Sequence, residues 1–313
     1  MARELYYTSA RKGLKPGTHG FCTVARSDGL SNGLVRLLES LSAYKSFFSG
    51  HTEDADKNPV SICHFRASIR EGSFSILSRI GAAGRDHTNR DNKLAHHIVL
   101  EKDERPAGGP AWLASQGIFA ESWQGEPRLI DTPLALPDGD DPDTTATTWD
   151  MVTGDAGWAG ALANCFENQP NRPVYLVYEA GMDVLPLVAE AVRTLPAAKR
   201  WLVTFNTYFF QLTAGVTCGW RCCPAGSPQL KDPRLTANAW VIDLTRPLGD
   251  PPLSHTVKVA RGEAKPALPK PRRSADSGPA ATNRADSEFV LMRNRMREKI
   301  SLRPDPDKRR GDV

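Results

Sequence analysis

The densest group of chemically active side chains lies in residues 84–100, GRDHTNRDNKLAHHIVL. Asp86, His87 and His96 are residue types that act as general acids and bases, and His and Asp can also ligate a divalent metal. One hypothesis is therefore a metal-assisted or acid–base hydrolase that uses Asp86, His87 and His96. Successive side chains on a strand point to opposite faces, so a regular strand cannot direct both His96 and His97 into one pocket.

The same segment also allows a structural interpretation. The side chains of Asp86, Arg90 and Asn92 can hold a long loop in place by hydrogen bonds. One of the two histidines would then pack in the core, and the other would face solvent. The chain contains no HExxH motif, no paired CxxC motifs and no regular HxH spacing, so the sequence predicts neither a metal site nor a cofactor.

A second dense patch is TCGWRCCP, residues 217–224. A structural zinc site needs a second pair of ligands at suitable spacing, and the nearest later histidine is His255. We therefore expect a strand at 219–223 that ends at Pro224 and packs its thiols as small apolar groups. The six cysteines are scattered along the chain, which is not typical of a disulfide framework.

Other catalytic and nucleic-acid signatures are missing from the sequence. There is no GxxxxGK[ST] loop, no GxGxxG after a strand and no GxSxG elbow, so nothing indicates nucleotide hydrolysis or serine esterase chemistry. The basic runs KPRR and DKRR are short and lack interleaved aromatic residues. Specific nucleic-acid binding is therefore not expected.

The chain of 313 residues, 40% of them hydrophobic and 24% charged, has the composition of an ordinary two-domain protein. Its longest apolar stretch, 174–195, is interrupted by four charged residues, so no transmembrane segment is expected. The first twelve residues lack the apolar stretch of a signal peptide. We therefore expect a cytoplasmic protein.

The elements that position residues 84–100 follow alternating two-residue and 3.6-residue periodicities, which indicate a mixed α and β protein. Strands are predicted at 5–9, 20–26, 60–68, 73–80 and 94–100, with helices at 31–48 and 110–116. The resulting order is ββαβββα. It predicts an α+β domain over residues 1–131.

A second unit is predicted after a linker at 132–148, which is rich in Pro, Asp, Gly and Thr. Helices at 158–166 and 184–195 alternate there with strands at 174–178, 201–210 and 239–244. Such alternation favours a three-layer α/β domain with a mainly parallel sheet, over residues 149–257.

The charge is concentrated at the C-terminus. Residues 258–313 hold 15 basic and 8 acidic side chains, a net charge of +7, whereas residues 1–257 have a net charge of −3. The Pro, Ser and small residues there predict a disordered basic tail. A candidate short helix at 288–302 within it has apolar residues at spacings of three and four, and could make weak contact with an anionic surface.

Several blocks occur in a fixed order along the chain, namely YYTSARKGLKPGTHGFCTVARSDGL, LSRIGAAGRDHTNRDNKLAHHIVL, WQGEPRLI and WLVTFNTYFFQLTAGVTCGWRCCPAGSPQ with VIDLT. Together these blocks resemble the N-terminal module of bacterial GTPase-associated proteins. The resemblance implies an adaptor in a GTPase-centred conflict system, an accessory to a GTPase and not the GTPase itself. It supplies no catalytic motif.

A second similarity is one of topology alone. The ββαβββα order looks like a longin unit, and a longin unit followed by an α/β domain is similar to the layout of DENN proteins, which engage small GTPases. Both resemblances imply a non-catalytic adaptor whose folded domains bind a GTPase or another NTPase-system protein. The candidate contact residues are Lys15, Pro16, His19, Arg26, Arg85, Asp86, Arg90, Asn92, Thr204, Asn206 and Tyr208.

Overall fold

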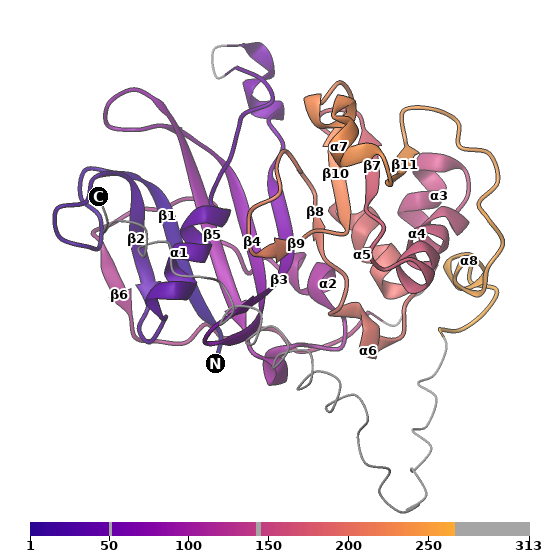
Figure 1. Ribbon diagram of the computed structural model, residues 1–313, viewed down its shortest axis with the longest axis horizontal. Coiled ribbons are helices and arrows are strands. Elements are labelled where there is room, and N and C mark those ends of the chain that lie inside the picture. Colours follow the sequence, from indigo (N-terminus) through magenta and orange to yellow (C-terminus); the bar gives the residue numbers. More distant parts are fainter. Residues whose placement is uncertain (50–51, 142–144, 267–313) are drawn as a thin grey trace, which may run out of the picture. The chain divides into compact units, whose positions relative to one another are not determined.

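A computed structural model describes residues 1–49, 52–141 and 145–266 of the chain (Figure 1). The candidate helix at 288–302 and most of the predicted basic tail lie outside these described residues. None of the helices in the described segments is both long enough and apolar enough to cross a membrane.

The N-terminal part confirms the predicted ββαβββα order. Two short 3-10 helices and one further strand accompany these elements. The elements are β1 (Arg3–Ala10), β2 (Gly20–Ser27), α1 (Asn32–Leu41), η1 (Glu53–Lys57), β3 (Ser61–Ile69), β4 (Gly72–Arg85), β5 (Asp91–Leu100), η2 (Lys102–Glu104), α2 (Pro110–Ala114) and β6 (Arg128–Ile130).

The remaining part alternates helices with short strands, as its periodicity predicts. The elements are α3 (Thr147–Thr153), α4 (Gly157–Asn168), β7 (Val174–Tyr178), α5 (Leu185–Arg193), α6 (Ala197–Arg200), β8 (Phe205–Asn206), β9 (Val216–Thr217), β10 (Trp220–Pro224), η3 (Pro228–Lys231), α7 (Pro233–Thr236), β11 (Trp240–Asp243) and α8 (His255–Ala260).

The strand predicted at 201–210 is wrong in extent, because only Phe205–Asn206 pairs as a strand. The chain is still turning after α6, where the backbone N–H of Leu202 donates to the carbonyl of Lys199 at 2.9 Å. Beyond β8, the N–H of Phe209 donates to the carbonyl of Cys222 at 2.7 Å, outside the regular ladder. Most of the apolar side chains that suggested a strand are instead buried in an irregular segment, although Leu202 is exposed.

The described strands form one mixed sheet in the order β11-β7-β10-β8-β3-β4-β5-β1-β2-β6, with β9 added beside β3. Strands β11, β7, β10 and β8 are parallel to one another, and the strands from β3 to β2 are antiparallel. The edge strand β6 is parallel to β2. The two arrangements meet where β8 pairs antiparallel with β3, with Cys63 opposite Asn206 and His64 opposite Phe205. The sheet is therefore continuous from the N-terminal part of the described chain to its later part (Figure 1).

Helices cover both faces of this sheet. On one face, α3, α4, α5 and α8 pack on the side chains of Val174, Leu176 and Cys222. On the other face, α1 and residues of α7 pack with Tyr175 and Cys223. Neighbouring strand residues thus contribute to opposite cores, as the alternation of side chains along a strand requires.

Helix α1 shows how the sequence sets this packing. The Ser31 hydroxyl accepts a hydrogen bond from the N–H of Leu34 at 3.2 Å, which caps the helix N-terminus. Leu34, Leu38 and Leu41 recur at helical spacing and are buried against the sheet. The polar residues of α1 are left on its outer side.

Helix α8 extends the fold past residue 257, where the sequence predicts the tail to begin. Val257, Val259 and Ala260 are fully buried, and the Thr256 hydroxyl donates to the carbonyl of Gly160 at 2.7 Å. Six residues are too few to show a helical periodicity beside the charged residues that follow. Residues 258–266 are thus described with the folded part of the chain.

Candidate partner-binding site

Two loops that hold predicted contact residues lie at the same end of the sheet. Strand β1 ends beside the start of β5, with Thr8 opposite Leu94, so the β1–β2 loop is near the β4–β5 hairpin (Figure 1). Lys15, Pro16 and His19 are exposed in the first loop. The structure therefore brings these residues to the same end as the hairpin residues 85–92.

Asp86 organises the hairpin. Its carboxylate accepts hydrogen bonds from the Thr88 hydroxyl at 2.7 Å, the Arg90 N–H at 3.1 Å and the Ser9 hydroxyl at 2.8 Å, and it pairs with the Arg90 guanidinium at 3.0 Å. The hydrogen bond from Thr88, with those from Arg90 and Ser9, holds the pKa of Asp86 well below its ordinary value. The prediction that Asp86 and Arg90 tie down this loop is confirmed.

Asn92 ties the hairpin to β1. Its side-chain oxygen accepts from the N–H of Ser9 at 3.1 Å and from the N–H of Lys93 at 2.8 Å. Asp86 and Asn92 are therefore engaged within the fold, while Arg85 and Arg90 expose their side chains at the hairpin.

A groove of about 590 Å³ lies next to the first of these loops, between α1 and the edge of the sheet. We refer to it as the α1 groove. It is lined by Leu14, Lys15, Thr23, Arg26, Asn32, Val35, Arg36, Glu39 and Leu129.

The α1 groove is basic. Lys15, Arg26 and Arg36 line it with a single carboxylate, Glu39, which accepts a hydrogen bond from the buried Thr23 hydroxyl at 2.7 Å. Arg26 donates to the carbonyl of Leu30 at 2.8 Å, a partner that orients the guanidinium but does not neutralise its charge. The groove therefore has an excess of positive charge suited to a carboxylate-rich ligand.

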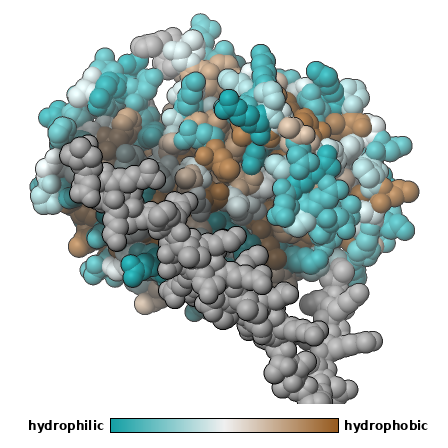
Figure 2. Space-filling model, viewed as in Figure 1, coloured by the Kyte–Doolittle hydropathy of each residue, from teal (hydrophilic) through white to brown (hydrophobic). Residues whose placement is uncertain are grey.

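The sequence identified two of these three cations. Lys15 and Arg26 lie in the block that resembles known relatives, whereas Arg36 belongs to the polar side of α1, where basic residues usually contact only solvent. Leu129 adds apolar surface, since 52% of it is exposed at the rim. Figure 2 shows hydrophilic residues over much of the face drawn there, with small hydrophobic groups between them.

His96 is a buried structural residue. Its Nε2 lies 2.9 Å from the Glu4 carboxylate, its Nδ1 accepts from the N–H of Ala120 at 3.0 Å, and its ring stacks on Tyr6 with centroids 4.1 Å apart. Burial alone would raise the pKa of Glu4, but the hydrogen bonds from His96 and from the Tyr6 hydroxyl lower it below its ordinary value.

His97 is buried on the opposite face of β5. The Ser42 hydroxyl donates to the carbonyl of Leu38, so it accepts the hydrogen bond that joins it to Nε2 of His97 at 2.8 Å. Nδ1 of His97 then accepts from the Ser78 hydroxyl at 2.7 Å. The prediction that one of the two histidines faces solvent is wrong, because both faces of β5 are covered.

The residues of the hydrolase hypothesis do not meet. Asp86 forms a hydrogen bond with Ser9 near one end of β1, whereas His96 forms one with Glu4. Ser9 and Glu4 are five residues apart, which is about 16 Å along the strand. His87 is exposed at the hairpin. Within the described ranges, no group of three or more His, Cys, Asp or Glu side chains is placed to hold a metal ion.

The cysteine patch packs as predicted. Cys218, Cys222 and Cys223 are buried in and before β10, which ends at Pro224. Burial raises the pKa of Cys218 and of Cys223 to about 12, so these thiols stay protonated at neutral pH.

Thr204, Asn206 and Tyr208 are buried, not surface residues. The Asn206 side-chain oxygen accepts from the Ser61 hydroxyl at 2.9 Å, and the Tyr208 hydroxyl donates to the carbonyl of Lys45 at 2.7 Å. The Thr204 hydroxyl accepts from the N–H of Gly219 at 2.9 Å. These side chains join β8 to its surroundings. The accessible candidates for partner contact are therefore the loop residues and the α1 groove.

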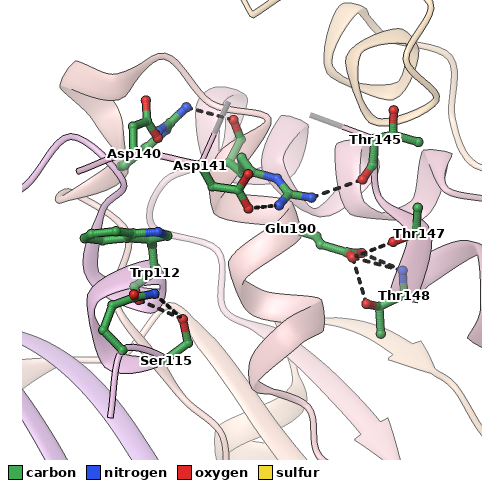
Figure 3. Close-up of polar contacts among 11 residues, drawn as sticks. Trp112, Ser115, Asp140, Asp141, Thr145, Thr147, Thr148 and Glu190 are labelled. Carbon is green, nitrogen blue, oxygen red and sulfur yellow. Dashed lines mark hydrogen bonds and ion pairs between the residues drawn. The ribbon is translucent and has the colours of Figure 1, made fainter. Parts of the chain in front are cut away.

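A buried carboxylate outside the predicted segments joins two helices (Figure 3). Glu190 of α5 accepts hydrogen bonds from the backbone N–H and the hydroxyl of Thr148, at 2.9 and 2.7 Å, and from the N–H of Trp149 at 3.2 Å. It therefore caps the N-terminus of α3 from a neighbouring helix. Close by, Arg193 pairs with Asp141. Sequence reasoning missed Glu190, because the position has no local capping pattern.

Comparisons with known proteins match most of the chain. The family model described as GTPase-associated protein 1, N-terminal domain type 2, matches residues 1–135. The model described as GTPase-associated protein 1, middle domain, matches residues 147–246. No curated protein and no solved structure matches the chain.

Proposed function

The chain belongs to the GTPase-associated protein 1 family, and from this premise we propose that it is a non-catalytic adaptor for a GTPase or another NTPase component of its system. In this proposal the protein acts in the cytoplasm of a bacterium, as part of a conflict system. The observation that carries it is the α1 groove, which lies within the segment matched by the N-terminal domain.

The α1 groove favours an acidic polypeptide segment as the ligand. Lys15, Arg26 and Arg36 outnumber Glu39 there, and the exposed Leu129 offers apolar contact beside the charges. Acidic side chains of a partner would form charge-assisted hydrogen bonds with the two guanidinium groups. Basic residues at an interface also speed the encounter with an acidic partner.

The β1–β2 loop and the β4–β5 hairpin extend the proposed contact. Pro16 and His19 are exposed beside Lys15, and Arg85 and Arg90 are exposed at the neighbouring hairpin. Asp86 and Asn92 would act indirectly, since their hydrogen bonds fix the shape of the hairpin. The longin and DENN analogies support the same kind of partner, because they rest on the ββαβββα order.

A pull-down from the native host tests the proposal with the full chain as bait. Lysates loaded with a GTP analogue or with GDP are compared in parallel. We expect an NTPase to be enriched by the wild-type protein and to be reduced at least about tenfold by Arg36→Glu, which replaces an attractive charge with a repulsive one.

Arg70→Glu is the matched control. Arg70 is exposed at the β3–β4 turn and is not one of the residues that line the α1 groove, so the same charge reversal should leave capture unchanged. Failure to enrich any NTPase in either nucleotide state would refute the adaptor proposal. Equal capture by wild type and Arg36→Glu would refute the α1 groove as the site.

A further inference from the structure

An unusual group of buried polar atoms surrounds Arg66 on β3. Among the described residues, five buried side-chain nitrogen or oxygen atoms have no hydrogen-bond partner, and three of them are Nε2 of His64, Oγ of Ser75 and Nε of Arg105. Buried polar atoms nearly always have a partner, so a cluster of unpartnered atoms calls for a ligand or a water molecule.

The sheet places His64, Arg66 and Ser75 together. Arg66 on β3 lies directly opposite Ser75 on β4, which sets their Cβ atoms about 5 Å apart on one face. His64 is two residues before Arg66, so its side chain lies on the same face. Both His64 and Ser75 are fully buried.

Arg105 reaches the cluster from the segment after β5. The carbonyl of its neighbour Pro106 accepts a hydrogen bond from the Trp201 indole at 2.7 Å, and the Trp201 ring packs against His64 with centroids 5.4 Å apart. Burial lowers the pKa of Arg105, and the positive charge of Arg66 lowers it further. The two guanidinium groups are therefore close enough to repel each other.

Neither arginine is paired with a carboxylate in the described part of the chain. Arg66 lines a groove of about 480 Å³ that has no acidic residue in its lining. Arg105 lines a second groove of about 520 Å³, where Asp103, Glu104 and Asp138 are also present but form no ion pair with it. Each arginine thus reaches a groove open to solvent, and neither forms an ion pair there.

The hydrogen-bond donors and acceptors of the cluster limit which ligands it can bind. Nδ1 of His64 donates to the carbonyl of Val203 at 2.6 Å, so in the neutral ring Nε2 can only accept. The guanidinium groups are donors, and the Ser75 hydroxyl can donate as well. A ligand that satisfies all of them must offer several acceptor oxygens and one O–H donor. Hydrogen phosphate has both, whereas sulfate and ionised carboxylates have acceptors alone.

We propose that His64, Arg66, Ser75 and Arg105 form a binding site for inorganic phosphate. The guanidinium groups of Arg66 and Arg105 bind two phosphate oxygens, and the Ser75 hydroxyl donates to a third. The P–OH group donates to Nε2 of His64. This site lies on the face of the sheet opposite α1, so it is independent of the α1 groove.

Isothermal titration calorimetry of the full chain at pH 7.5 tests the site with inorganic phosphate, sulfate and methyl phosphate as probes. We expect phosphate to bind and sulfate to bind at least about tenfold more weakly, because sulfate leaves Nε2 of His64 unsatisfied. Methyl phosphate largely loses its P–OH above a pKa of about 6 and should also bind more weakly. Tighter binding of methyl phosphate would overturn the requirement for inorganic phosphate.

Variants separate this site from binding elsewhere on the surface. Arg66→Gln and Arg105→Gln should each weaken phosphate binding at least about tenfold, since each removes a charge-assisted hydrogen bond. Arg70→Gln, an equal charge change at an exposed position of the β3–β4 turn, should leave binding unchanged. Equal titrations of wild type and Arg66→Gln would overturn the proposal. So would a crystal structure at saturating phosphate with only water between these four side chains.

Discussion

His97 is a neutral imidazole held between two serine hydroxyls, and its burial sets how the fold responds to acid. Burial lowers the pKa of His97 to about 3. Burial, together with the nearby positive charges of Arg105 and Arg66, also lowers the pKa of His64 to about 3. In the unfolded chain both groups titrate near their ordinary pKa of about 6.5. Below that pH the unfolded state binds protons that the folded state does not, so stability falls between about pH 6.5 and 3.

We expect the free energy of unfolding to be about 1.4 kcal/mol lower at pH 5.5 than at pH 7.5 for each of these two histidines. Urea unfolding in phosphate-free buffer measures the difference. His97→Gln should lose about half of this dependence. The control His87→Gln changes an exposed residue and should keep the wild-type dependence. An unaltered slope in His97→Gln would contradict the assignment.

At the residue scale, the sequence predicts local relations and misses distant ones. Strand alternation correctly separated His96 from His97, and the hydrogen-bonding capacity of Asp86, Arg90 and Asn92 correctly indicated a fixed loop. The partners of His97, in contrast, come from α1 and β4, which no local pattern connects. The same reason hid Arg66 and Arg105, which are close only in the folded chain.

Helices α3 and α5 are joined by Glu190, whose carboxylate takes the place of a local N-cap. The first residues of a helix have backbone N–H groups without partners, and here two of them donate to a buried carboxylate of another helix. Loss of the Glu190 carboxylate should therefore destabilise both helix α3 and its contact with α5.

Glu190→Ala should lower the free energy of unfolding by about 2–4 kcal/mol, because it leaves several buried donors unsatisfied. Thermal and urea denaturation measure the change. Glu126→Ala removes an exposed carboxylate and should stay within about 0.5 kcal/mol of wild type. A change of similar size in both variants would show that Glu190 does not act as the cap.

At the element scale, long elements with a clear periodicity could be predicted from the sequence, whereas short elements could not. Helix α1 repeats leucines at helical spacing and is capped by Ser31, so the sequence was sufficient to place its start. The helix ends at Leu41, however, and the predicted continuation to residue 48 is wrong. Strand β8 has two residues and α8 has six, too few for either periodicity to appear. Their positions depend on pairing with β3 and on packing against α4.

The continuous sheet governs the behaviour of the whole chain. One core combines Leu5 and Ile76 of the antiparallel part with Tyr175 and Phe209 of the later segment. Strands β3 and β8 also pair directly. The two segments matched by family models should therefore depend on each other for folding.

We expect fragments 1–141 and 145–266 to copurify when they are coexpressed, and each to be insoluble when it is expressed alone. Phe205→Asp in the second fragment should abolish association, because it places a charge in the core beside β3. Leu253→Asp alters a residue that is 86% exposed and should leave association intact. Soluble, folded monomers of either fragment would show that the parts fold independently.

The sequence could not reveal this continuity. Alternating periodicities predict the strands of each part, but the order of strands in a sheet depends on contacts between distant residues. The junction consists of two residue pairs between β3 and β8 and two more between β3 and β9. None of these pairs is distinguished by its composition.

None of the six cysteines forms a disulfide, so their thiols can be used to measure local opening of the folded protein. Cys165 is partly exposed at the end of α4, whereas Cys63, Cys222 and Cys223 lie in the shared sheet. A thiol reagent can modify a buried cysteine only while the surrounding structure is open. The labelling rate of each cysteine therefore measures how often its region opens. Mass spectrometry of partly labelled protein would thus time the opening of the β8–β3 junction separately from that of the helical layer.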